Sequence, residues 1–278
     1  DPRSVPAQRS LGEVLVVDED FAGALVHLRA ALALTPDDAK LRARIAEIEK
    51  KAAVEGSFRD ARHNHFTARF EGYAEEQLSW TALDLLDKAY FSIGATLDTY
   101  PTEPITVVIY TGDQYKQATD APDWSAGIYD GTIRVREGNI VAASGALEGL
   151  LRHEYTHAVL ATWKTPLPAW FNEGLAMYFE GTGDAAAQIC ARAKRDGTLT
   201  SFADLDKPSL IGMSDNDAAR TAYAMSATVV RALVDRRGEY ALQSLASRLK
   251  AGESFANAFN ETYATSPRAF VDAWVESL

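Results

Sequence analysis

The chain has 278 residues, which is enough for one large domain or two modest ones with a buried core. Its formal net charge of −11 at pH 7 argues against nucleic acid or anionic lipid as partners, because those surfaces recruit basic proteins. The sequence contains no apolar run long enough to span a bilayer, and its single cysteine, Cys190, excludes an internal disulfide.

Residues 1–56 are predicted to form a helical segment. The first ten residues are polar, contain two prolines and are expected to be a tail, and the helical pattern then runs from Leu11 to Gly56. The stretch A-A-L-A-L-T-P at residues 30–36 resembles the closing turn of a tetratricopeptide repeat, and an unrelated helical hairpin accounts for it equally well. The resemblance implies a docking arm for a protein partner.

Residues 57–143 carry the signals of a small mixed sheet. Short runs of alternating or β-branched residues predict strands, an Asp-Gly pair predicts a hairpin turn, and a long amphipathic pattern predicts one helix. The strands are expected within 65–70, 104–110 and 125–135, and the helix within 77–97.

The most informative motif is His153-Glu154-Tyr155-Thr156-His157, an H-E-x-x-H. Residues four apart on a helix share one face, so His153 and His157 can direct one imidazole nitrogen each to one metal ion. Glu154 is then placed to act as a general base on an activated water. The alternative is a helix with two surface histidines. However, the apolar flanks predict a mostly buried helix, in which histidines and a carboxylate need partners.

A third metal ligand is expected from residues 166–181, which are predicted to form a second helix with prolines at its start and a glycine at its end. The short turn before this helix brings Glu173 opposite the two histidines. Glu173 also lies in an apolar run, where an unpaired charge is costly. Glu180 is the rival ligand, and Gly174 is expected to let the two helices approach closely.

The sequence HEYTH followed by LPAWFNEGLAMYFEG resembles the gluzincin metallopeptidases, the thermolysin-like clan, and within it the bacterial peptidase MA-like domain. The resemblance implies that His153, His157 and Glu173 bind zinc and that Glu154 is the general base. The step from His157 to Glu173 is 173 − 157 = 16 residues, shorter than in thermolysin. The residue four beyond Glu173 is Met177, not thermolysin's acidic residue, so Glu173 needs another orienting partner.

The resemblance also implies an α+β fold. A helical segment, 1–56, precedes one gluzincin-like domain, 57–278. That domain divides into a lobe with the sheet and the zinc helix, 57–181, and an α-helical lobe, 182–278. Residues 126–134 are expected at the sheet edge where substrate backbone adds as a strand, with a purely structural hairpin as the alternative. Family habit favours the cell envelope or exterior as the location.

Tyr223 lies in A-Y-A-M-S, which resembles the A-Y-x-x-S element of MA-like domains. The resemblance implies that its hydroxyl donates a hydrogen bond to the oxyanion formed during hydrolysis, and a core aromatic is the alternative. Tyr155 and Tyr178 are weaker candidates that are more simply explained as packing residues.

His63 and His65 form an H-x-H, a spacing that can bind a metal. They are interpreted as surface or edge-strand histidines, because the expected zinc site has its ligands without them.

These features predict a zinc-dependent peptidase that cleaves peptide bonds with an activated water. No G-x-M-E-N-like segment that would anchor a free amine is present, which favours an endopeptidase. The competing class is a catalytically quiet or latent scaffold in a tetratricopeptide-containing assembly, and a weaker one is a hydrolase of non-peptide amides. The expected partners are a peptide or protein substrate and a protein bound at the N-terminal helical segment.

Overall fold

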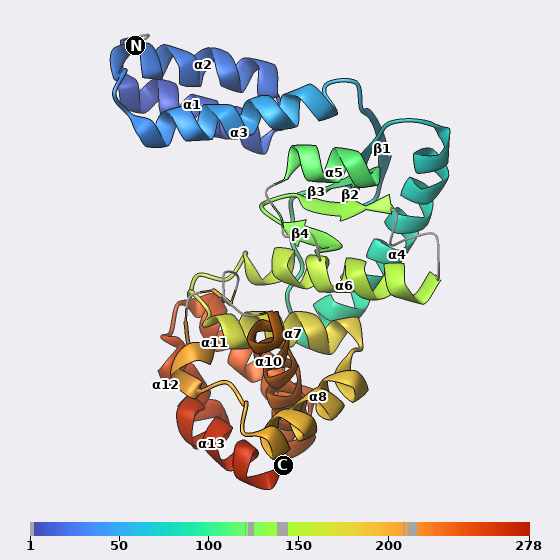
Figure 1. Ribbon diagram of the computed structural model, residues 1–278, viewed down its shortest axis with the longest axis vertical. Coiled ribbons are helices and arrows are strands. Elements are labelled where there is room, and N and C mark those ends of the chain that lie inside the picture. Colours follow the sequence, from blue (N-terminus) through green and yellow to red (C-terminus); the bar gives the residue numbers. More distant parts are fainter. Residues whose placement is uncertain (1–2, 120, 122–124, 138–143, 208, 211–215) are drawn as a thin grey trace. The chain divides into compact units, whose positions relative to one another are not determined.

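The computed structural model describes residues 3–119, 121, 125–137, 144–207, 209–210 and 216–278 (Figure 1). The chain forms two compact units. The first unit comprises Asp1–Arg62, Thr67–Trp80 and Thr106–Ala142, and the second comprises His63–Phe66, Thr81–Ile105 and Ala143–Leu278. None of the helices in the described ranges is long and apolar enough to cross a lipid bilayer.

The first unit begins with three helices, α1 (Val5–Val17), α2 (Phe21–Leu34) and α3 (Ala39–Glu55), drawn in blue in Figure 1. The expectation of an N-terminal tail was wrong, because α1 already starts at Val5. Its start is stabilised by the Ser4 hydroxyl, which accepts from the Ala7 amide, and by a proline in the first turn. The helices bury an apolar core of Phe21, Leu25, Leu28, Ala31, Leu41, Ile45 and Ile48.

A small mixed sheet follows, as the sequence predicted, and it has five strands. Its order is β1-β2-β3-β5-β4, with β3 parallel to β5 and β4 antiparallel to β5. The first strand of this sheet was not foreseen, while β4 does lie at an edge, as expected for the start of segment 126–134. The elements are β1 (Arg59–His63), β2 (Phe66–Phe70), β3 (Ile105–Tyr110), the short helix α5 (Gly112–Ala118), β4 (Gly127–Tyr129) and β5 (Ile133–Arg136).

A buried ion cluster joins α3 to the sheet. Arg134 on β5 is 3% exposed, and its guanidinium Nη1 lies 2.7 Å from the carboxylate of Glu55 at the end of α3. The hydroxyl of Tyr110 contacts both groups, and Asp130 binds Arg134 at 3.1 Å and Lys51 at 2.7 Å. Burial raises the pKa of Glu55 despite these partners. The division predicted at residue 56 thus falls inside the first compact unit, and it stays a prediction.

The second unit is mostly helical. It contains residues 81–97 of α4 (Tyr73–Leu97), and its helix α10 packs against both α7 and α8. Trp170, which is fully buried, packs edge-on against Phe255 and Phe259 and ties α7 to α12. The helices are α6 (Ser144–Leu160), α7 (Ala169–Glu180), α8 (Gly183–Asp196), α9 (Phe202–Leu205), α10 (Asn216–Arg237), α11 (Glu239–Ala251), α12 (Phe255–Tyr263) and α13 (Pro267–Ser277).

Replacement of Arg134 by Met is expected to destabilise the protein by about 3–5 kcal/mol, because it leaves the buried Glu55 without its cation. Urea unfolding at pH 7 measures the loss. Since the pKa of Glu55 is raised, its protonation at lower pH removes the unpaired charge, and the deficit is expected to shrink there. Arg29→Met is the control, because Arg29 pairs with Glu49 at the surface and is expected to matter by less than about 1 kcal/mol. Equal losses in the two variants would contradict the assignment.

Candidate metal centre

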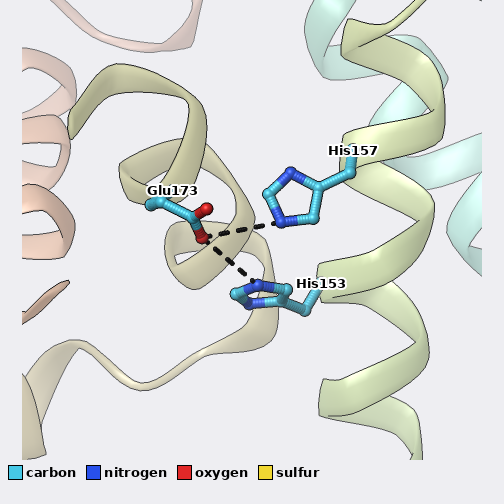
Figure 2. A group of neighbouring side chains, drawn as sticks. All are labelled: His153, His157 and Glu173. Carbon is cyan, nitrogen blue, oxygen red and sulfur yellow. Dashed lines mark ion pairs between the residues drawn. The ribbon is translucent and has the colours of Figure 1, made fainter. Parts of the chain in front are cut away.

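Helix α6 presents both histidines of the H-E-x-x-H on one face. Leu147, Leu151 and Val159 bury the opposite side of the helix in the core, which fixes its rotation about its axis. Figure 2 shows the rings of His153 and His157 projecting from α6 towards Glu173, which comes from α7. The prediction that Glu173 faces the two histidines is therefore met in the structure.

The three side chains converge with a geometry suited to one ion. The Glu173 Oε2 atom lies 3.7 Å from Nε2 of His153 and 3.6 Å from Nε2 of His157. All three potential ligand atoms lie within 4.8 Å of one another. In a tetrahedral zinc site with bonds of about 2.0–2.1 Å, ligand atoms are about 3.3 Å apart. Two imidazoles and one carboxylate also match the preferred donors of Zn²⁺, so the residues present fit a zinc ion.

The outer nitrogens of both imidazoles are held by side chains of α7. Nδ1 of His153 lies 2.9 Å from a carboxylate oxygen of Glu180, and Nδ1 of His157 lies 2.9 Å from Oδ1 of Asn172. Both acceptors suit a proton on Nδ1, and Nε2 of each ring faces Glu173, as a metal ligand requires. Glu180, the rival ligand in the sequence, thus contacts the far side of a histidine.

Sequence reasoning missed Asn172 entirely. The sequence did offer one indication of this role. Asn172 directly precedes Glu173, so both residues lie on the turn of α7 that faces α6. A ligating histidine needs an acceptor for its second nitrogen, so each histidine of the motif calls for such a residue nearby.

The site concentrates negative charge. Burial disfavours the charged form of His153, but hydrogen bonds to Glu173 and Glu180 outweigh burial and raise its pKa to about 10. Burial would likewise raise the pKa of Glu173, but the hydrogen bond to His153 and the charge on His157 lower it. The cluster thus favours a positive charge beside Glu173, which is the electrostatic requirement for binding a divalent cation.

The pKa values of Glu154 and Tyr223 are both affected by the negative charge of Glu173. Glu154 is 4% exposed, and burial raises its pKa to about 7, which suits a group that accepts and returns a proton near neutral pH. Burial also raises the pKa of the Tyr223 hydroxyl, with further contributions from the charges of Glu173 and Glu154. Tyr223 thus keeps its proton and can act as a hydrogen-bond donor.

The two weaker tyrosine candidates have other surroundings. Tyr155 is fully buried against the rings of Phe66 and Tyr90, and Tyr178 donates a hydrogen bond to Glu239 at 3.3 Å. Both therefore act as packing or surface residues.

Gly174 permits a close approach, but not the expected one. A Cβ at this position would lie 2.5 Å from the backbone oxygen of Ser226, so the glycine brings α7 against α10. The approach of α6 to α7 instead depends on Gly149, where a Cβ would lie 3.2 Å from the backbone oxygen of Glu180. Helix α10, which carries Tyr223, is thereby packed tightly against the turn of α7 that carries the candidate ligand Glu173.

The H-x-H pair, His63 and His65, does not belong to the group formed by His153, His157 and Glu173. His63 and His65 flank the carboxylate of Asp87 at 3.2 and 3.6 Å, and the ring of His65 stacks on Tyr90. Both side chains are more than one third exposed, and β1, which ends at His63, is an edge strand. The interpretation as surface and edge-strand histidines agrees with this placement.

Comparison with known proteins identifies the family. Residues 86–278 match the model of the Peptidase MA superfamily, and the chain belongs to this superfamily. Its membership supports the gluzincin-like fold and a metallopeptidase type of hydrolase.

A search of curated proteins found no match. Among solved structures, the chain is similar to a mutant of an M1 zinc metallopeptidase from Deinococcus radiodurans, with 16% identity and a TM-score of 0.45. The similarity covers 78% of this chain and 50% of that enzyme, so the chain spans about half the length of the solved structure.

Gly174→Ala is expected to destabilise the protein by about 1–3 kcal/mol, because the added methyl group must push α7 and α10 apart. Urea unfolding at one pH measures the change. Gly183→Ala is the matched control at the start of α8, where a Cβ meets nothing within 4 Å. A Gly174→Ala protein as stable as this control would contradict the tight packing.

Glu180→Ala is expected to weaken zinc binding by about 10–100-fold, because His153 loses the acceptor that orients its ring. Glu180→Gln keeps an oxygen at the same place and should lose less. Competition with a chromophoric chelator measures the affinity, and Glu261→Gln on the exposed face of α12 is the control. Unchanged affinity in Glu180→Ala would rule out the orienting role.

Proposed function

We propose that the chain is a zinc-dependent peptidase that hydrolyses peptide bonds with an activated water. The observation that carries the proposal is the convergence of His153, His157 and Glu173 from two helices, with the buried Glu154 beside them. Membership of the Peptidase MA superfamily supports the same reaction class. Zinc bound by these three residues would polarise the scissile carbonyl and acidify a water molecule.

The roles of the other residues follow from their positions. Glu154 would accept the proton of the attacking water and pass it to the leaving amine, a task that suits a carboxyl group with a pKa of about 7. Tyr223 would donate a hydrogen bond to the oxyanion as the carbonyl is attacked. Glu180 and Asn172 would keep the histidine rings in place.

An endopeptidase is favoured over an aminopeptidase, because no acidic segment suited to holding a free amine was found in the sequence. Blocked peptides test this choice directly. Cleavage of a peptide with an acetylated N-terminus and an amidated C-terminus is expected, and a strict need for a free N-terminus would contradict it.

The competing proposal is a quiet scaffold with a tetratricopeptide-like docking segment. One observation favours it: α1 exposes Leu11, Val14 and Val17 at helical spacing, with exposed fractions of 44, 55 and 80%. Stoichiometric zinc without hydrolysis of any peptide in a broad panel would favour the scaffold.

The central test combines zinc content with turnover. About one zinc per chain is expected, and His153→Ala should lose it. Glu154→Gln should retain zinc but lower kcat/KM by about 10²–10⁴-fold, because only the proton acceptor is removed. Glu148→Gln, on an exposed turn of the same helix, is the control. Full activity in Glu154→Gln would remove it as the base, and absence of zinc in the wild type would remove the proposal.

A further inference from the structure

The second unit has a cavity that the proposed chemistry does not use. It has a volume of about 530 Å³, and its walls come from α8 and from the start of α10. This size is in the range of pockets that hold small ligands or peptide side chains. Its charged lining consists of Arg192 and Asp196 on α8 and of Asp217 and Arg220 on α10.

The two arginines of this cavity differ from most others in the protein. Within the described ranges, no hydrogen bond or ion pair is found for Arg192 or Arg220, although Asp196 and Asp217 lie on the same walls. An unpaired guanidinium presents a fork of donors that matches a carboxylate. The two aspartates limit how much negative charge the cavity accepts, which favours a single carboxylate over a phosphate dianion.

Helix α10 connects the cavity with the proposed reaction centre, because its first turns line the cavity and it also packs against α7. Arg220 precedes Tyr223 by three residues, and side chains at this spacing on a helix are neighbours, about 5–6 Å apart at Cβ. Ser226, three residues beyond Tyr223 on α10, packs directly against Gly174, the residue that follows Glu173. A peptide whose scissile bond lies at Glu154 could therefore place a nearby residue against the arginines.

We propose that this cavity is a specificity subsite in which Arg192 and Arg220 bind a carboxylate of the substrate, within a few residues of the scissile bond. The proposal rests on the proposed peptidase function. Because the whole chain carries a net charge of −11, its long-range field does not attract acidic peptides, and recognition must come from these two local cations.

The test compares blocked fluorogenic peptides that differ only by Glu against Gln at each position flanking the cleaved bond. The wild type is expected to prefer a Glu peptide by about tenfold or more in kcat/KM. Arg192→Gln and Arg220→Gln should each reduce the preference while zinc content stays unchanged. Arg195→Gln is the matched control, since Arg195 lies on the last turn of α8 outside the cavity.

A second pair of peptides, with a free or an amidated C-terminus, separates the two sources of a carboxylate. A higher kcat/KM for the free C-terminus, with no difference between the blocked Glu and Gln peptides, would assign the cavity to the substrate's terminus. A Glu preference in the blocked peptides, with no effect of amidation, would assign it to an acidic side chain. Equal kcat/KM for all matched pairs, or a preference that survives both arginine substitutions, would overturn the subsite and leave the peptidase proposal standing.

A binding experiment keeps the two proposals distinguishable. Fluorescence anisotropy of the labelled Glu and Gln peptides is measured on the zinc-loaded Glu154→Gln protein, where no turnover is expected. Tighter binding of the Glu peptide that depends on Arg192 and Arg220 would support the subsite, even if the wild type hydrolyses nothing and the peptidase proposal fails. Equal binding of both peptides in that case would overturn the subsite as well.

Discussion

The central interaction of the second unit is the buried contact of the Glu173 carboxylate with the imidazole rings of His153 and His157. Glu173 lies within 4 Å of both His153 and His157, and each of the three side chains is less than one fifth exposed. Glu154 and Glu180 add further negative charge at the same point. Such a cluster is costly to bury unless a cation balances it, so its presence on rigid helices is the main physical argument for a metal centre.

The surrounding helices keep these groups in register. Gly149 sets the spacing of α6 to α7, and Gly174 sets the spacing of α7 to α10. One helix, α7, supplies the candidate ligand Glu173 as well as the acceptors Asn172 and Glu180 that hold the two histidines. A small displacement of α7 would thus disturb the ligand and both orienting contacts together, which makes its packing against Trp170's aromatic neighbours part of the site's support.

The first unit depends on a different buried charge arrangement. Glu55 and Arg134 are 79 residues apart in sequence and join the last turn of α3 to the sheet. The N-terminal helices are therefore anchored to the sheet through Glu55. A docking role for the exposed stripe on α1 is compatible with this anchoring, because that stripe does not contribute to the cluster.

The sequence by itself determined the elements with strong periodicity and the metal motif. The strand at Ile105–Tyr110, the two helices that carry the candidate metal ligands and the grouping of His153, His157 and Glu173 could be predicted from the sequence. Spacing along one helix fixes which of its side chains share a face. Only the tertiary structure revealed Asn172 and Glu180 on the outer nitrogens, Gly174 against α10, and the arginine-lined cavity. These features depend on how separate helices pack, and periodicity within one helix carries no information about its neighbour.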